Sequence, residues 1–523
     1  MSKARAGRRR APLSLVLPAL LTVALLLLPL VYLVIRATGG GKAWRLIWRR
    51  DTLELVLSTG LLVAGVTAAS VAIGVSLAWL TVRTDLPGRR AWAVAATLPL
   101  VVPSYVAAFC LLGAFGPRGL LQQLLGVERL PEIYGYWGAL LALTLSTYPY
   151  VLLLTSAALR GLDPSLEEAA RGLGRSGLDV FRRVTLPALR PSIGAGALLV
   201  ALYALSDFGV VSLMRYDALT RAIYLQYRSL FDRTPAAVLA LVLVALTVLV
   251  LIVEGRSRRR TSRSSPGVAR PTRPLRLGRW KLPALAYCTT VVGAFLVVPA
   301  VVLGYWLVRG LDRAEVPIRE ALNSVSASAL AAGVAALAAL PIALLAHRWP
   351  SRWTRLLERL AFAGNALPGI VIALSLVFFA ANYASPIYQT LALLVFAYVI
   401  RFLPLALAGV ESSLAGVSPR VEEAARSLGR SPVRAALTVT VPLVRSGILA
   451  GAALVFLSAL KELPATLLLR PIGFETLATE IWKFTSVGAY SRAAPPALLL
   501  IAVSAPFVYV LSTRHRPEAT EHG

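Results

Sequence analysis

The stretch that decides the fold is EEAARGLGRSGLDVFRRVTLPALRPSI, residues 167–193, because the chain carries it almost twice. The near copy, EEAARSLGRSPVRAALTVTVPLVRSGI, covers residues 422–448 and begins 255 residues later (422 − 167). Both copies are polar, whereas the sequence around them is largely apolar. A polar segment that returns at matched places predicts a chain built from two similar halves.

The composition is that of a membrane protein. Of the 523 residues, 57% are hydrophobic and 15% are charged, whereas a soluble protein carries about 25% charged residues. The apolar residues form runs of roughly twenty, which is enough to cross ~30 Å of hydrocarbon as a helix. Because lipid-exposed backbone must satisfy its own hydrogen bonds, we expect an all-α polytopic membrane protein.

We expect about twelve membrane spans in two tandem sets of six. The first half covers residues 1–253, a basic linker covers 254–282, and the second half covers 283–523. The first apolar run is too long for a signal peptide, so we interpret it as an uncleaved span. The expected spans are roughly 12–35, 54–82, 91–115, 137–159, 192–214 and 235–253, then 283–308, 323–347, 356–381, 388–410, 446–469 and 495–512.

The net charge of +29 predicts orientation rather than nucleic-acid binding. The basic residues cluster in the loops between apolar runs, as the positive-inside rule requires. This places both termini and the Arg-, Ser- and Pro-rich linker in the cytoplasm, and each repeated segment follows the fourth span of its half on the same side. The loop at residues 36–52 is basic but lies outside in this topology. We expect the lipid bilayer, and no nucleic acid, as a partner.

Cysteine and histidine do not indicate a metal site. Cys110 and Cys288 both fall inside apolar runs, where a thiol is a small core residue. Of the three histidines, His347 lies at the end of a span and His515 and His522 lie in the C-terminal tail, and no Cys, His and carboxylate cluster has metal-ligand spacing. We therefore assign no metal ligand with certainty.

Each repeated segment predicts a helix, a tight turn and a second helix. An N-cap side chain precedes a proline at the first helical position, and two glutamates follow near the positive end of the helix dipole. A glycine is placed to end the helix with positive φ, and a later proline is expected to break the second helix before the membrane. The matched pairs are Asp163 and Ser418, Pro164 and Pro419, Gly174 and Gly429, and Pro187 and Pro442.

A short amphipathic hairpin with a face of small residues needs something to cover that face. The chain's own membrane domain, the bilayer surface and a soluble partner are the alternatives. Because the segment is duplicated about a pseudo-two-fold axis, it suits two copies of one partner.

The segment resembles the signature of ABC-importer permeases, which is E-A-A, three residues, G, nine residues, an aliphatic residue, one residue and L-P. Both copies match it, except that Val441 stands where the signature has Leu. The resemblance implies a type I ABC-importer permease fold, with a coupling helix in each of the segments 161–190 and 416–445 that docks on a cytoplasmic ATPase subunit. The implied coupling residues are Glu167, Glu168, Ala169, Ala170, Gly174, Pro187, Glu422, Glu423, Ala424, Ala425, Gly429 and Pro442.

The chain lacks an ATPase motif of its own. No G-x-x-x-x-G-K-[ST] sequence is present, and GGGKA at residues 39–43 lacks both the earlier glycine and the hydroxyl residue. We expect a transport subunit that is not an enzyme and holds no cofactor, with ATP bound by two copies of the partner subunit.

Charged residues inside spans are candidates for the transport pathway. Asp207 and Glu462 are 255 residues apart and follow the two coupling segments, and Lys461 and Arg401 are two further intramembrane charges. Such charges are costly in hydrocarbon and therefore suggest function. They could line a path for a cationic substrate, fix helix packing, or carry protons in a secondary transporter.

The same stretches narrow the substrate by resemblance. SDFG at residues 206–209 and KELPAT at 461–466 are similar to sequences of the ferric-iron importer permeases, which are also fused two-half chains. The resemblance implies iron as cargo, a periplasmic or lipid-anchored solute-binding protein as partner, and the bacterial inner membrane as location. Related permeases for thiamine, polyamines or phosphonates share the coupling signature and stay as alternatives.

Overall fold

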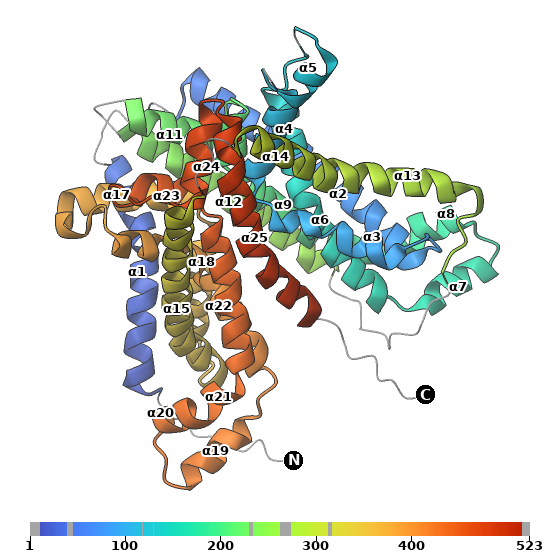
Figure 1. Ribbon diagram of the computed structural model, residues 1–523. Helices are drawn as coiled ribbons and strands as arrows, with labels where there is room; N and C mark the ends of the chain where they lie inside the picture. The colour runs from blue at the N-terminus through green and yellow to red at the C-terminus, as the bar shows by residue number, and fades with distance from the viewer. Residues whose placement is uncertain are drawn as a thin grey trace. The chain divides into compact units, whose positions relative to one another are not determined.

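The computed structural model describes residues 11–38, 45, 47–117, 119–128, 130–229, 234–261, 274–311 and 316–514 (Figure 1). The basic N-terminal residues, the GGGKA stretch, the middle of the linker and the C-terminal tail lie outside these ranges, and so do the predictions made on them. Within the described ranges the chain is helical, with one isolated parallel bridge between Thr84 and Leu275. The all-α architecture expected from the sequence is confirmed.

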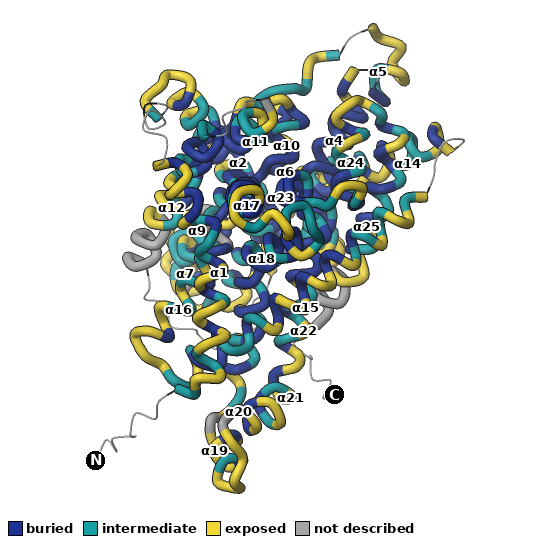
Figure 2. Tube along the Cα trace, turned by 90° about the vertical axis from the view of Figure 1, so that its left-hand side faces the viewer, coloured by how far each residue is buried: buried dark blue, intermediate teal, exposed yellow. Residues whose placement is uncertain are grey.

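The helices gather into two compact units. Unit 1 comprises residues 1–41, 317–480 and 499–523, and unit 2 comprises residues 42–316 and 481–498. In each unit the centre is a group of long helices whose inward faces are buried, with short helices at the ends (Figure 2).

Unit 2 is built around the long helices α2, α6 and α9. Its helices are α2 (Arg50–Arg83), α3 (Arg89–Ala95), α4 (Ser104–Phe115), α5 (Leu120–Leu125), α6 (Tyr136–Gly161), α7 (Pro164–Gly172), α8 (Gly177–Val180), α9 (Leu186–Ser206), α10 (Gly209–Leu213), α11 (Leu219–Ser229), α12 (Thr234–Thr261), α13 (Lys281–Val292) and α14 (Val298–Arg309). Two glycines let these helices approach closely. A Cβ on Gly74 would lie 2.7 Å from Cβ of Val151, and one on Gly196 would lie 2.8 Å from Cα of the same residue.

Unit 1 is built around α15, α18 and α22. Its helices are α1 (Leu13–Thr38), α15 (Ile318–Arg348), α16 (Arg352–Phe362), α17 (Gly369–Tyr383), α18 (Leu391–Leu414), α19 (Pro419–Ser427), α20 (Pro432–Ala435), α21 (Val441–Leu443), α22 (Arg445–Leu460) and α23 (Pro464–Leu469). The last two helices, α24 (Leu477–Ser486) and α25 (Tyr490–Arg514), each contribute residues to both units.

Each unit contains the first span of the other half of the sequence. In unit 1, α1 packs on α15 and α17, and the Tyr32 ring meets the Phe379 ring edge-on at 5.7 Å between centroids. In unit 2, α14 packs on α4, and Nε1 of Trp306 donates a hydrogen bond to the Gly113 carbonyl at 3.1 Å. The sequence halves 1–253 and 283–523 stay a prediction, and the compact units cut across them.

The apolar helices match most of the expected spans. Within the described residues nine helices are long and apolar enough to cross a membrane, or ten if a pair bent by 67° at Val444 counts as one span. The third and ninth expected spans are each interrupted, because α4 and α17 begin directly after Pro103 and Pro368. A proline lacks the N–H that would continue the helix. The fifth and eleventh expected spans also end early, at Ser206 and Leu460, and a short helix follows each of them.

The linker is ordered at both ends, where the sequence predicted no regular structure. At one end α12 continues to Thr261, and at the other the backbone of Leu275 accepts from Asp85 N at 3.0 Å and donates to Arg83 O at 2.8 Å. A carboxylate oxygen of Asp85 accepts from Leu277 N at 2.8 Å, and the other pairs with Lys281 at 2.9 Å. These contacts lower the pKa of Asp85 from its ordinary value, the Leu277 N–H first among them.

Close packing of α18 against α22 generates a stability prediction. A Cβ on Gly409 would lie 2.7 Å from the Gly447 carbonyl oxygen and 2.8 Å from Cα of Gly451, both of which are backbone atoms. Gly409→Leu should therefore cost about 1–3 kcal/mol of unfolding free energy through overpacking. Thermal unfolding of the detergent-solubilised chain measures this as a lower midpoint.

The matched control is Gly333→Leu on α15, where an added Cβ meets nothing within 4 Å. Equal midpoints for the two variants would contradict the close packing of α18 on α22.

Candidate functional site: two coupling segments and two intramembrane carboxylates

The first helix of each repeated segment forms as its sequence predicts. Oδ1 of Asp163 accepts a hydrogen bond from Ser165 N at 3.0 Å and begins α7, and Oγ of Ser418 accepts from Arg420 N at 3.4 Å and begins α19. In each helix a proline takes the first position. The two N-caps are confirmed.

A glycine in the left-handed region ends each of these helices. Gly174 has φ +79° and Gly429 has φ +88°, as expected. In the first copy the N–H of Arg175 then reaches the Ala170 carbonyl at 3.3 Å, and in the second copy Arg430 makes the same bond to Ala425. This backbone pattern is a Schellman motif, which requires positive φ at the residue after the helix.

The prolines further along behave differently in the two copies. In the first copy a π-helical turn, Phe181–Thr185, runs straight into α9, and Pro187 is accommodated in the first turn of that helix. The expected break is absent there, and Pro187 follows the π-helical turn without interrupting the helix. In the second copy the break occurs, two residues after Pro442, and the helix axis turns by 67°.

The two glutamates of the first copy have different surroundings. Glu167 is buried, and its Oε1 accepts from Oγ1 of Thr185 at 2.9 Å and lies 3.6 Å from Nη2 of Arg83, the last residue of α2. Glu168, the next residue, is exposed. Glu167 therefore attaches α7 to the end of α2, and Glu168 faces outward.

The second copy repeats this arrangement. Glu422 is buried, and its Oε2 lies 3.0 Å from Nε of Arg348, the last residue of α15, and 3.1 Å from Oγ1 of Thr440. Glu423 is exposed. Thr185 and Thr440 each follow their glutamate by 18 residues.

The two arginines were not among the residues that the sequence singled out. Arg83 and Arg348 have side chains exposed by only 4% and 7%. A buried arginine requires a counter-charge, and here the coupling helix supplies it. The signal available in the sequence was that each half ends its second span in an arginine.

The outer face of each hairpin is apolar and uncovered. Leu173 and Leu428, the residues before the turn glycines, are 84% and 85% exposed, and Figure 2 draws α19 largely as exposed. Ala169 and Ala424 are also exposed, whereas Ala170 is half-buried and Ala425 is buried. Each hairpin thus leaves one large aliphatic side chain exposed at the same place.

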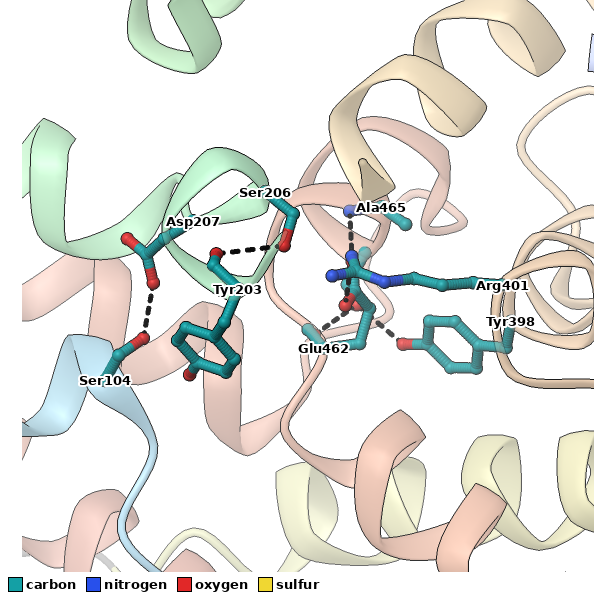
Figure 3. Close-up of polar contacts among 9 residues, drawn as sticks. Ser104, Tyr203, Ser206, Asp207, Tyr398, Arg401, Glu462 and Ala465 are labelled. Atoms are coloured by element: carbon teal, nitrogen blue, oxygen red, sulfur yellow. Dashed lines mark hydrogen bonds and ion pairs between the residues drawn. The ribbon is translucent and has the colours of Figure 1, made fainter. Parts of the chain in front are cut away.

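Asp207 closes the break at the end of α9 (Figure 3). Its Oδ2 accepts from Oγ of Ser104 at 2.6 Å, and its Oδ1 accepts from Val210 N at 2.8 Å. Its backbone carbonyl accepts from Oγ1 of Thr220 at 2.7 Å. The carboxylate thus begins the short helix α10, which is the N-cap role with a buried residue.

Glu462 closes the equivalent break after α22, where Lys461 ends the helix and is half-buried. Oε1 of Glu462 accepts from Ala465 N at 3.1 Å, and Nη1 of Arg401 on α18 lies 2.8 Å from both carboxylate oxygens (Figure 3). Its carbonyl accepts from Oγ1 of Thr466 at 2.7 Å. The sequence left open whether Arg401 partners one of the acids, and it partners this one.

The two halves give their carboxylates different partners by exchanging residues at matched positions. Ser104 and Gly369 each follow the proline that precedes a helix. A Cβ on Gly369 would overlap the Arg401 guanidinium. The arginine side chain therefore fits only because residue 369 is a glycine. Arg401 itself is replaced by Ser146 in the first half, 255 residues earlier. One carboxylate therefore has a hydroxyl partner and the other a guanidinium.

In the part of the chain that the structure describes, no group of three or more His, Cys, Asp or Glu side chains could hold a metal ion. The role of Asp207, Glu462, Lys461 and Arg401 as pathway residues stays a prediction.

The sequence matches one protein family twice. Residues 70–263 and residues 339–515 each match the family described as the binding-protein-dependent transport system inner membrane component. These ranges contain both coupling segments and both intramembrane carboxylates.

Several curated proteins are similar to the chain. It is 35% identical over 514 residues to the Fe(3+)-transport system permease protein FbpB 2 of Haemophilus influenzae, covering 96% of this chain and 98% of that protein. It is 24% identical over 475 residues to the ferric transport system permease protein FbpB of Actinobacillus pleuropneumoniae, covering 86% and 69%. It is 32% identical over 196 residues to the molybdenum transport system permease protein ModB of Escherichia coli, covering 35% of this chain and 83% of that protein.

Neighbouring glutamates provide a matched test of the coupling segment. Glu167→Gln leaves Arg83 buried without a counter-charge and should cost about 3–5 kcal/mol of stability, whereas exposed Glu168→Gln should change it by less than about 0.5 kcal/mol. Thermal unfolding, followed together with limited proteolysis at residues 161–190, measures both effects. Equal behaviour of the two variants would show that Glu167 does not anchor α7.

Gly369 provides a test of the carboxylate in unit 1. Gly369→Ser should displace Arg401 from Glu462 and lower the unfolding midpoint, because breaking a buried pair costs about 3–5 kcal/mol. Adding Arg401→Ser reproduces the two serines of the first half and should recover most of the loss. A double variant no more stable than Gly369→Ser would contradict this compensation.

Proposed function

This chain belongs to the family of binding-protein-dependent transport system inner membrane components, and on that premise we propose that its cargo is ferric iron. The observation that carries the proposal is coverage. The match to the Fe(3+)-transport permease spans 96% of this chain, whereas the match to the molybdenum permease spans 35%. The relative that matches both halves at 35% identity is thus an iron permease, and SDFG and KELPAT fall within the matched length.

The chain is the permease of an ABC importer, and its family depends on a solute-binding protein by description. We propose that two copies of a separate cytoplasmic ATPase subunit dock on the two hairpins α7–α8 and α19–α20 and bind the ATP. The exposed Leu173 and Leu428 support this, since two equal apolar surfaces suit two equal partners. Glu168 and Glu423, in the first helices of the same two hairpins, are also exposed.

The placement of the remaining partners follows from the same topology. A periplasmic or lipid-anchored solute-binding protein would dock at the ends of the helices opposite to the hairpins, and both termini would lie in the cytoplasm. The permease itself would hold no cofactor. Membership of this family favours the ABC class over a proton-coupled secondary transporter that uses Asp207 and Glu462.

The buried ion pairs support a route for mechanical coupling. Closure of the ATPase subunits on ATP would move α7 and α19. Glu167–Arg83 and Glu422–Arg348 would pass that movement to the ends of α2 and α15, which run through the centre of each unit. Alternating access would follow as these helices move, and the binding protein would release its cargo into the opened permease.

We propose that the carboxylates at the two helix breaks act along the pathway. Asp207 and Glu462 each hold the start of a short helix, so a change in their bonding would change the local path of the chain. Their negative charge suits a cationic metal, although in unit 1 Arg401 neutralises it. Lys461 adjoins this pair.

Uptake by proteoliposomes tests the cargo. The chain, its ATPase and its binding protein are reconstituted, and labelled Fe(III), thiamine, putrescine and a phosphonate are offered separately with ATP. We expect uptake of iron only, because the chain matches an iron permease over nearly its full length. ATP-dependent uptake of another ligand would overturn the iron proposal and leave the permease assignment intact.

The control for coupling is the double variant Gly174→Val and Gly429→Val. Valine is strained at positive φ, so both hairpins should deform while the spans insert normally. Iron uptake should fall about tenfold or more, the size of effect expected when about 1.4 kcal/mol of coupling is lost. Normal uptake by this variant would contradict docking of the ATPase on the hairpins.

A further inference from the structure

Unit 2 contains a cavity at the end of the helices far from the hairpin α7–α8. Its volume is about 780 Å³, within the range of small-molecule sites. Tyr134, two residues before α6 begins, lines it, and α7 follows the other end of that 26-residue helix. The length of α6 separates the cavity from the hairpin by about 40 Å. In the predicted topology the cavity therefore opens on the outer side.

Arg215 gives the cavity a positive charge. Arg221 also lines it but forms an ion pair with Asp217, and none of the described residues that line the cavity is Asp or Glu. The guanidinium of Arg215 lies 4.8 Å from the centre of the Tyr134 ring, which fixes its orientation. Aromatic side chains form much of the remaining wall, among them Tyr224, Trp306, Trp482 and Tyr490.

The backbone at Arg215 is strained. Its φ is +54°, a value that is uncommon for a residue other than glycine. Two hydrogen bonds hold the turn, from Arg215 N to the Ser212 carbonyl at 3.2 Å and from Tyr216 N to the Val211 carbonyl at 2.8 Å. Strain of this kind is retained where surrounding structure fixes it, and it accompanies binding sites.

The two halves differ in whether the arginine at this position pairs with a carboxylate. The counterpart of Arg215 is Arg470, 255 residues later, and it forms an ion pair with Glu475. The counterpart of Glu475 is Asp217, since each lies two residues before a leucine whose N–H bonds a hydroxyl at a matched position. Asp217 pairs with Arg221 instead, and its side chain is 78% exposed. In the first half this carboxylate therefore pairs with Arg221 and not with Arg215.

We propose that this cavity binds a small oxyanion, a molecule that carries carboxylate or phosphate groups. Arginine presents a planar set of donors that matches the oxygens of these groups. The inference deepens the proposed function and, for the identity of the cargo, rests on it. Bare Fe(III) would be repelled by the guanidinium of Arg215, whereas an anionic complex of Fe(III) with oxygen ligands would be attracted. The permease then receives iron together with its anion.

Direct binding tests the proposal without iron, ATP or transport. The purified full chain in lipid nanodiscs is dialysed against labelled citrate and, separately, against labelled inorganic phosphate. Saturable binding of at least one anion is expected below about 1 mM. Arg215→Gln should weaken it about tenfold, which corresponds to the loss of about 1.4 kcal/mol.

One further variant separates the site from general charge. Arg50→Gln removes an exposed arginine of α2 that pairs with Glu54, and it should leave anion binding unchanged. Equal weakening by Arg215→Gln and Arg50→Gln, or no saturable binding of either anion, would overturn the proposal.

The remaining outcomes distinguish this inference from the proposed cargo. If anion binding depends on Arg215 but the permease imports something other than iron, the anion site is supported. Only the claim that its ligand is a ferric complex is then wrong. If neither anion binds but Arg215→Gln weakens capture of the solute-binding protein, the cavity receives a carboxylate of that protein and the inference is wrong.

Discussion

The structure depends on one constraint, which is that hydrocarbon offers no hydrogen bonds to a broken helix. The chain breaks its spans repeatedly, before α4 and α17 and after α9 and α22. A break inside a membrane exposes backbone N–H groups at the cost of several kcal/mol each, by the usual order of magnitude. Asp207 and Glu462 reduce that cost by each accepting from one N–H in the first turn of the helix that follows. These two carboxylates therefore have a structural role, which is to bond backbone N–H groups at the helix breaks.

The need to pair buried polar groups also bears on the two successive glutamates of each coupling segment. On a helix, neighbouring residues point about 100° apart, so one carboxylate can enter the protein while the next faces outward. Glu167 and Glu422 are buried against arginines at the ends of α2 and α15, and Glu168 and Glu423 remain exposed. The buried member ties the short helix α7 or α19 to a long helix at the centre of its unit.

Duplication preserved the backbone arrangement but not the charges. The N-caps, the turn glycines and the buried Glu–Arg–Thr contacts occur in both halves. At the helix breaks, however, Ser104 and Ser146 are replaced by Gly369 and Arg401, and Arg470 pairs with Glu475 whereas the corresponding Asp217 pairs with Arg221. The two halves thus share the contacts that hold their hairpins and differ in the partners of their charged residues.

The sequence by itself determined the class of the fold, the duplication and the local form of the coupling helices. These depend on hydrophobic run length and on short-range chemistry, such as Asp163 with Pro164 or the need for glycine at positive φ. Only the tertiary structure decided which glutamate is buried, which helices are shared between the units, and what each carboxylate bonds. Arg83 lies 84 residues before Glu167 (167 − 83), and Arg401 lies 61 before Glu462. Contacts between residues so far apart in the sequence depend on how the helices cross and pack. A local sequence pattern does not contain that information.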